Sequence, residues 1–116
     1  VLARRHERDM GALAAWCSAQ APAVVAVDAP CRWRAEGGPA RAAERELMRA
    51  GIHCYLTPTK ARARGHPFYR WMLPGAELFA ALERQFPLYT GEAAVRPASI
   101  ETFPQAVACS LAGKPV

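Results

Sequence analysis

The chain lacks the patterns that would assign it to several common classes of protein. Its four cysteines are scattered, without a Cys-x-x-Cys pair or a cysteine and histidine cluster at zinc spacing, so we expect reduced thiols instead of disulfides or structural zinc. No apolar run approaches the roughly 20 residues of a membrane span, and the N-terminal residues do not form a signal-peptide pattern. A nucleophile triad, a phosphate-binding loop and a dinucleotide-binding glycine pattern are also missing. These absences predict a cytoplasmic protein without a membrane partner.

The composition is that of a small globular domain. Of the 116 residues, 52% are hydrophobic, which is enough for one modest core and excludes wholesale disorder. We therefore expect a single α/β domain over residues 1–116. Fifteen Lys and Arg against ten Asp and Glu give a net charge of +5, a balance that favours polyanionic partners but is also common in proteins that bind none.

One stretch organises the rest of the chain. Residues 23–27 are consecutive small or β-branched apolar residues, which is typical of a strand buried on both faces of a sheet. Asp28 and then Pro30 follow, so Asp28 is expected at the carboxyl end of the strand, where open α/β sheets place ligands. Asp28 at this position either contributes to a site or caps the next turn.

Hydrophobic spacing predicts the remaining elements. Helices are expected over residues 1–20, 39–50, 68–86 with a break at Pro74-Gly75, and 105–111. Strands are expected at 52–56, 88–90 and 98–101, the first of them paired in parallel with 23–28. In the 39–50 helix, Glu44 is expected to face solvent with its charged neighbours. Residues 57–67 predict a mobile basic loop at the same sheet edge as Asp28.

A second carboxylate repeats the arrangement around Asp28. Glu101 ends the 98–101 strand and is followed by Pro104, so Asp28 and Glu101 would lie close together if their strands are neighbours. Carboxylate oxygens are ligands for Mg²⁺ or Mn²⁺, which nucleases use to activate water and neutralise phosphate charge. The alternative is that both acids only form caps and salt bridges with nearby arginines.

Three motifs, in their order and spacing, give the chain a family resemblance. Val27-Asp28-Ala29-Pro30, the 41–47 segment with Gly51, and Glu101-Thr102-Phe103-Pro104 resemble the family catalogued as domain of unknown function 429. The resemblance spans roughly residues 23–112 and implies a ribonuclease H-like fold and nuclease activity, with Asp28 and Glu101 as catalytic and metal-binding acids. It also implies that Arg41, Glu44 and Arg45 belong to a polar helix after the Asp-Ala-Pro strand. The residues expected to hold the substrate are Arg41, Arg45, Lys60, Arg62 and Arg64.

The chain departs from this family at its start. Members of the family usually begin with a hairpin-forming strand that carries another Asp, and this strand is missing before Val1. We therefore expect a partial, truncated ribonuclease H-like layered fold, with a short parallel sheet flanked by helices. The sheet edge left uncovered would favour a homo-oligomer.

Three functions remain open at this point. The first is a divalent-metal-dependent nuclease or phosphodiesterase acting on nucleic acid. The second is a non-catalytic domain that binds nucleic acid or a nucleotide. The third is an inert truncated fragment that keeps only the fold.

Overall fold

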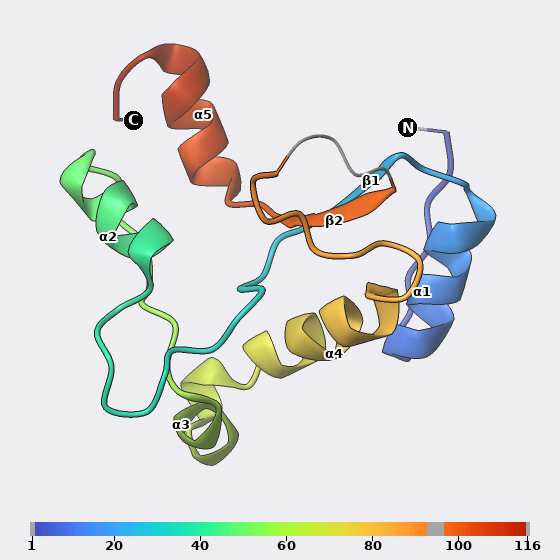
Figure 1. Ribbon diagram of the computed structural model, residues 1–116, viewed down its shortest axis with the longest axis horizontal. Helices are drawn as coiled ribbons and strands as arrows, with labels where there is room; N and C mark the ends of the chain where they lie inside the picture. The colour runs from blue at the N-terminus through green and yellow to red at the C-terminus, as the bar shows by residue number, and fades with distance from the viewer. Residues whose placement is uncertain (1, 93–96, 116) are drawn as a thin grey trace.

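Two short strands from distant parts of the chain form the sheet. The computed structural model describes residues 2–92 and 97–115. In it, β1 (Val24–Val27) and β2 (Ala98–Glu101) pair in parallel, with Val27 opposite Glu101. The architecture is mixed α/β, with five α-helices and this two-stranded sheet in the described residues (Figure 1). The expected α/β class is confirmed, and the arrangement is compatible with a partial layered fold.

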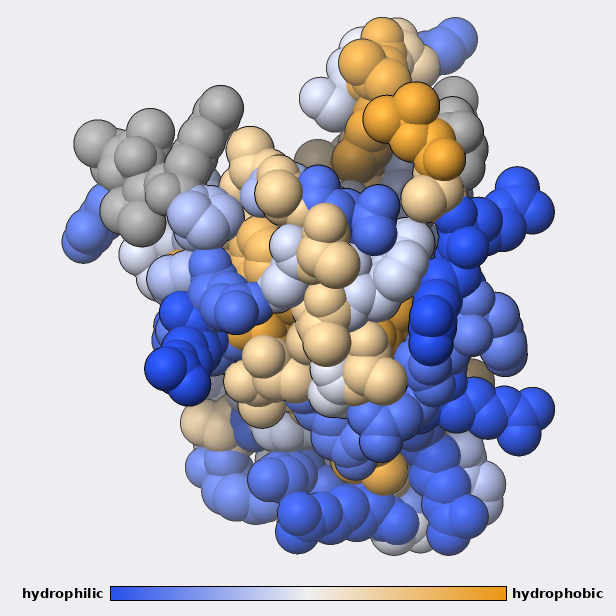
Figure 2. Space-filling model, turned by 90° about the vertical axis from the view of Figure 1, so that its right-hand side faces the viewer, coloured by the Kyte–Doolittle hydropathy of each residue, from blue (hydrophilic) through white to orange (hydrophobic). Residues whose placement is uncertain are grey.

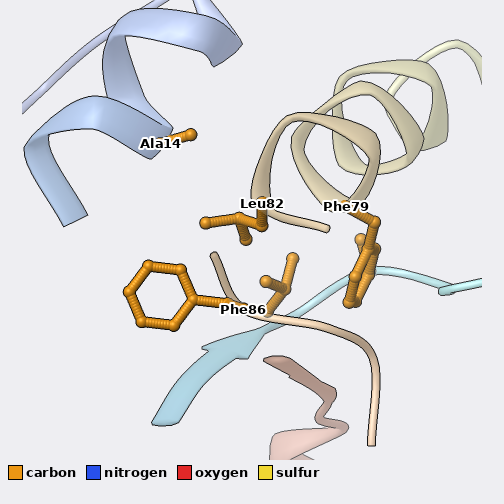
Figure 3. Close-up of a cluster of buried hydrophobic side chains, with 6 residues drawn as sticks. Ala14, Phe79, Leu82 and Phe86 are labelled. Atoms are coloured by element: carbon orange, nitrogen blue, oxygen red, sulfur yellow. The ribbon is translucent and has the colours of Figure 1, made fainter. Parts of the chain in front are cut away.

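The main hydrophobic core lies between the sheet and two packed helices. Helix α1 (Met10–Ala19) contributes Ala14, and α4 (Met72–Leu82) contributes Phe79 and Leu82, which meet Phe86 and Val27. Figure 3 shows these side chains converging beside β1. Helix α1 begins later than expected, because the Asp9 side chain caps it by accepting a hydrogen bond from the Ala12 N–H at 2.7 Å.

The C-terminal helices differ in detail from the expected ones. The break expected at Pro74-Gly75 lies earlier, because a 3₁₀ turn, η1 (Pro67–Tyr69), precedes α4. Pro74 falls in the first turn of α4, where a backbone N–H has no partner within the helix and proline is therefore tolerated. Helix α5 (Pro104–Ala112) ends at Gly113, whose φ of 68° provides the left-handed cap, as expected.

The strand expected at residues 52–56 is not formed, and its predicted parallel pairing with 23–28 is wrong. The partner of β1 is β2. The segment after α2 (Ala42–Arg49) is instead held by single contacts: the Thr57 N–H donates to Glu44, and the Arg34 N–H donates to the Pro58 carbonyl at 3.1 Å. With Tyr55 and Leu56 exposed, the segment lacks the burial that a two-sided strand requires. Residues 88–90 contribute only an isolated parallel bridge between Leu88 and Ser99.

The basic segment after it is not the mobile loop that was expected. Residues of this segment form α3 (Lys60–Gly65), capped by the Thr59 hydroxyl, which accepts from the Arg62 N–H at 3.3 Å. Ala63 is completely buried and anchors the helix. The sequence pattern did not reveal this anchor, because a single alanine between basic residues carries little hydrophobic signal.

The two strands of the sheet point in the same direction. Figure 1 shows both strands running toward the side of the molecule where α2 and α5 lie, so their carboxyl ends face that side.

Among the described residues, no helix is both long enough and apolar enough to cross a membrane.

Candidate functional site

A cavity of about 120 Å³ lies at the carboxyl ends of β1 and β2. Its polar wall is formed by four charged side chains: Asp28, Arg41, Glu44 and Glu101. Apolar and aromatic side chains, among them those of Trp71 and Met72, line the rest. The two strand-end acids expected to meet therefore do line one cavity, on neighbouring strands.

Arg41 connects the two glutamates of the cavity. It precedes α2, and its Nε donates to Glu44 Oε1 at 3.0 Å, one helical turn later. Its two terminal nitrogens bind both carboxylate oxygens of Glu101, at 2.9 and 2.6 Å. This bidentate arrangement joins the start of α2 to the end of β2, and it is among the stronger hydrogen-bonding geometries in proteins. The pKa of Arg41, which burial would lower, is raised by its contacts with the two glutamates.

Glu101 is held ionised by its surroundings. Besides Arg41, the backbone N–H of Cys31 donates to its Oε2 at 3.0 Å. Burial alone would raise the pKa of Glu101, but the hydrogen bonds from Arg41 and Cys31 and the positive charge of Arg41 lower it below the ordinary value. In return, burial and the Glu101 carboxylate raise the pKa of the Cys31 thiol, so that this thiol stays protonated at neutral pH.

Glu44 is buried, and the expectation that it faces solvent is wrong. Only 4% of the residue is exposed. Its Oε1 accepts from Arg41, from the Thr57 N–H at 3.0 Å and from the Thr57 hydroxyl. Its Oε2 is buried and has no hydrogen-bond partner among the described residues. Buried polar atoms are normally satisfied, so this oxygen is available to accept a hydrogen bond or to contact a cation.

Asp28 is the open acid of the site. It is exposed, and within residues 2–92 and 97–115 its carboxylate forms no hydrogen bond or ion pair. The cavity therefore contains three acidic side chains against one guanidinium. This excess of acidic groups favours a cation over an anion as the occupant of the cavity itself.

The oxygens that remain available fit a divalent cation only in part. A carboxylate offers about four lone-pair positions. Among the described residues, the Asp28 carboxylate and Glu44 Oε2 accept no hydrogen bond, whereas Glu101 already accepts three from nitrogen. No group of three or more His, Cys, Asp or Glu side chains among the described residues is arranged to hold a metal. A complete protein cage is thus not formed here, but Mg²⁺ commonly binds through one or two carboxylates together with water and substrate phosphate.

The basic residues expected to hold substrate fall into three places. Arg41 binds the two glutamates, as described. Arg45 is exposed on α2 and donates to the Ala40 carbonyl at 2.6 Å. Lys60 and Arg64 line a different cavity, of about 280 Å³, together with Trp33, and Arg62 lies 5.8 Å from the centre of the Tyr69 ring. The α3 residues thus form a basic surface outside the acidic cavity.

Two residues of the site were not expected from the sequence, Glu44 and Thr57. The signal for Glu44 was its spacing of three from Arg41, which places both side chains on one face of a helix. No sequence signal singles out Thr57, because its role depends on how the segment after α2 folds back onto that helix.

Comparisons with known proteins give one result. The family model described as "Protein of unknown function (DUF429)" matches residues 6–116. No curated protein and no solved structure matches the chain.

Proposed function

The chain belongs to the DUF429 family of proteins of unknown function, and we propose that it is a divalent-metal-dependent nuclease or phosphodiesterase acting on nucleic acid. The observation that carries the proposal is the open carboxylate of Asp28 in a cavity that also contains Glu44 and Glu101. A ribonuclease H-like layering is part of the proposal. The parallel β1–β2 pair with an acid at each carboxyl end supports it.

We assign different roles to the charged residues of the cavity. Asp28 and Glu101 are the residues that would hold Mg²⁺ or Mn²⁺. A cation bound there supplies charge neutralisation at the phosphate and a more acidic water. Arg41 is a positioning residue, since it orients both Glu101 and Glu44.

Substrate phosphates are held by the basic residues outside the cavity. We assign this role to Arg45, Lys60, Arg62 and Arg64, which are exposed on α2 and α3. Arg41 would have to break its hydrogen bonds to Glu101 before it could contact a phosphate. Its expected role in substrate binding therefore requires a rearrangement of the site. Contacts of this kind make binding strongly salt-dependent.

The test compares Asp28→Asn with the wild-type chain in cleavage of single- and double-stranded DNA and RNA with Mg²⁺ or Mn²⁺. We expect the variant to lose cleavage and to lose Mn²⁺ binding in calorimetry. Glu36→Gln is the matched control, because Glu36 is an exposed acid outside the cavity. Cleavage that persists in a chelator, or that Asp28→Asn retains, would show the proposal to be wrong.

A second function is favoured by the contacts of Arg41. Both oxygens of Glu101 are already bound by its guanidinium, so the acids could serve structure alone while the α3 surface binds nucleic acid or a nucleotide without catalysis. Binding that survives chelation, falls steeply with salt and leads to no cleavage by any metal-loaded sample would identify this function.

A homo-oligomer is also proposed, through the outer edge of β1. In the part of the chain that the structure describes, β1 pairs with a strand on one side only. An unpaired edge can add a strand from a second copy, and sedimentation analysis at several concentrations tests this.

A further inference from the structure

The segment between α2 and α4 contains a cluster of aromatic rings on the surface. Tyr55 lies 5.3 Å from Phe68, Phe68 lies 5.0 Å from Tyr69, and Tyr69 lies 5.3 Å from His66, measured between ring centres. His53 extends the cluster, 6.0 Å from Tyr55. We call these five residues the aromatic patch. It joins two segments that are separated by α3.

The rings are accessible to a ligand. Tyr55 is 65% exposed and Phe68 is 46% exposed. Side chains of this size that only filled the core would be largely buried. A contiguous exposed aromatic surface of this kind therefore indicates a binding function.

The chain segment that carries the patch has charged residues of one sign, whereas the acids of the cavity border it at Tyr55. Residues 51–76 contain Lys60, Arg62, Arg64 and Arg70 but no acidic residue. Arg62 lies over Tyr69, one of the rings of the patch. Figure 2, which faces the side of the molecule where α1 lies in Figure 1, shows hydrophilic side chains along its lower edge. A partner for this surface must therefore combine flat apolar groups with negative charge.

The patch is continuous with the acidic cavity. Tyr55 belongs to both, and Trp71, which is 52% exposed, lines the cavity beside it. A strand bound across the rings would thus pass the mouth of the cavity that contains Asp28.

We propose that the aromatic patch binds a single-stranded nucleic acid, with bases stacked on Tyr55 and Phe68 and phosphates held by the α3 cations. The proposal rests on the proposed function for its biological meaning, but the binding itself requires no cleavage and no metal. Unpaired bases can stack on aromatic rings, whereas a duplex keeps its bases stacked within itself and presents mainly phosphates. Ring stacking does not involve the sugar 2′-hydroxyl, so DNA and RNA strands of one sequence should bind similarly.

The experiment measures fluorescence anisotropy of a labelled oligothymidine of about 12 nucleotides, within the usual site sizes of single-strand binders, in a metal chelator. An oligouridine and a DNA duplex of the same length are measured in parallel. We expect the single strands to bind more tightly than the duplex. Tyr55→Ala and Phe68→Ala should each weaken single-strand binding about fivefold or more, the loss expected for one stacked base.

Two variants make the comparison specific. Tyr55→Phe keeps the ring and should bind as the wild type does. Tyr89→Ala removes a similarly exposed aromatic ring outside the patch, 48% exposed, and should leave binding unchanged. Circular dichroism of each variant checks that it is folded.

The outcomes separate this inference from the proposed function. Single-strand binding that depends on Tyr55 in a chain that never cleaves would uphold the inference and overturn the nuclease. If the folded Tyr55→Ala and Phe68→Ala variants cleave nucleic acid and bind the oligonucleotide as tightly as the wild type does, the nuclease would be upheld and the inference overturned. Binding of the duplex as tightly as of the single strands would also overturn the inference. So would a concentration-dependent dimer that Tyr55→Ala abolishes, because the patch would then bind a second copy of the chain.

Discussion

Removal of Arg41 is the perturbation whose effect the structure defines most closely. Arg41→Ala deletes three charged hydrogen bonds, one to Glu44 and two to Glu101. It also leaves two carboxylates in place without their cation. Because Glu101 lies on β2 and Glu44 on α2, the same substitution disconnects the helix from the sheet.

The magnitude follows from the burial of the three side chains. Those of Arg41, Glu44 and Glu101 are 14%, 5% and 27% exposed, so water replaces the lost contacts poorly. Removing one partner of a buried ion pair costs about 3–5 kcal/mol, and the partial exposure of Glu101 places the expected loss near the lower limit, at about 3 kcal/mol. This is a large share of the roughly 5–15 kcal/mol that stabilises a typical domain.

Urea unfolding followed by circular dichroism measures this loss. Arg41→Lys should fall between the wild type and Arg41→Ala, because an ammonium keeps the charge but cannot bind both glutamates through a planar fork. The control is Arg49→Ala, since Arg49 forms an ion pair with Glu46 on the same helix, with side chains 69% and 68% exposed. An exposed pair contributes about 0–1 kcal/mol.

One result would refute the reasoning about Arg41. If Arg41→Ala and Arg49→Ala lowered the free energy of unfolding equally, by less than about 1 kcal/mol, the bridge between α2 and β2 would not stabilise the fold. The Arg41→Lys result then separates charge from geometry. Equal stability of Arg41→Lys and the wild type would mean that the bidentate contact with Glu101 adds nothing beyond a positive charge.

Two further predictions concern the pH dependence of stability and the packing of α4 against Ala29. Because the folded state lowers the pKa of Glu101 below its ordinary value, this group stabilises the fold fully above the pKa of an unfolded glutamate, about 4.3, and the stabilisation is lost as the pH falls through the lowered pKa. Urea unfolding at a series of acidic pH values should show that Glu101→Gln flattens this part of the stability profile, and an unchanged slope would contradict the prediction. Gly75→Ala should destabilise by about 1–3 kcal/mol, because the new Cβ would lie 2.4 Å from the Ala29 Cβ. Gly65→Ala, with nothing within 4 Å of the new Cβ, serves as its control in thermal unfolding and should be neutral or slightly stabilising. Equal melting temperatures for the two alanine variants would show that α4 can move away from Ala29 at little cost.

The sequence predicted the strand that ends just before Asp28, the strand that ends with Glu101 and their position at one edge of a sheet. These features depend on local patterns, namely a short apolar run, an acid and a proline. The expectation that the first of these strands is buried on both faces is wrong, because Val24 and Ala26 of β1 are exposed. The predicted pairing partner of β1 was wrong, because residues 52–56 are apolar enough for a strand but form no ladder. The chain just after them is held instead by hydrogen bonds from the Thr57 N–H to Glu44 and from the Arg34 N–H to the Pro58 carbonyl. Which apolar run pairs with which is decided by tertiary packing, so a pattern within each run cannot reveal it.

The burial of Glu44 and the contact of Arg41 with Glu101 could not be predicted from the sequence for a related reason. Both residues look like the solvated face of a helix, and only the return of the chain at Thr57 buries Glu44. Likewise, the sequence did not indicate the aromatic patch, because Tyr55 and Phe68 are far apart in sequence. Their rings meet because α3 brings the two segments together.

The acids of the cavity differ in how firmly they are bound to the rest of the fold, and this difference determines which substitutions can test the proposed function. Glu101 and Glu44 are tied to the fold through Arg41, so their removal lowers stability and any loss of activity in those variants is ambiguous. Asp28 is exposed and has no such contact among the described residues, so Asp28→Asn should change the free energy of unfolding little. Of the three acids that line the cavity, Asp28 is therefore the one whose substitution isolates chemistry from folding.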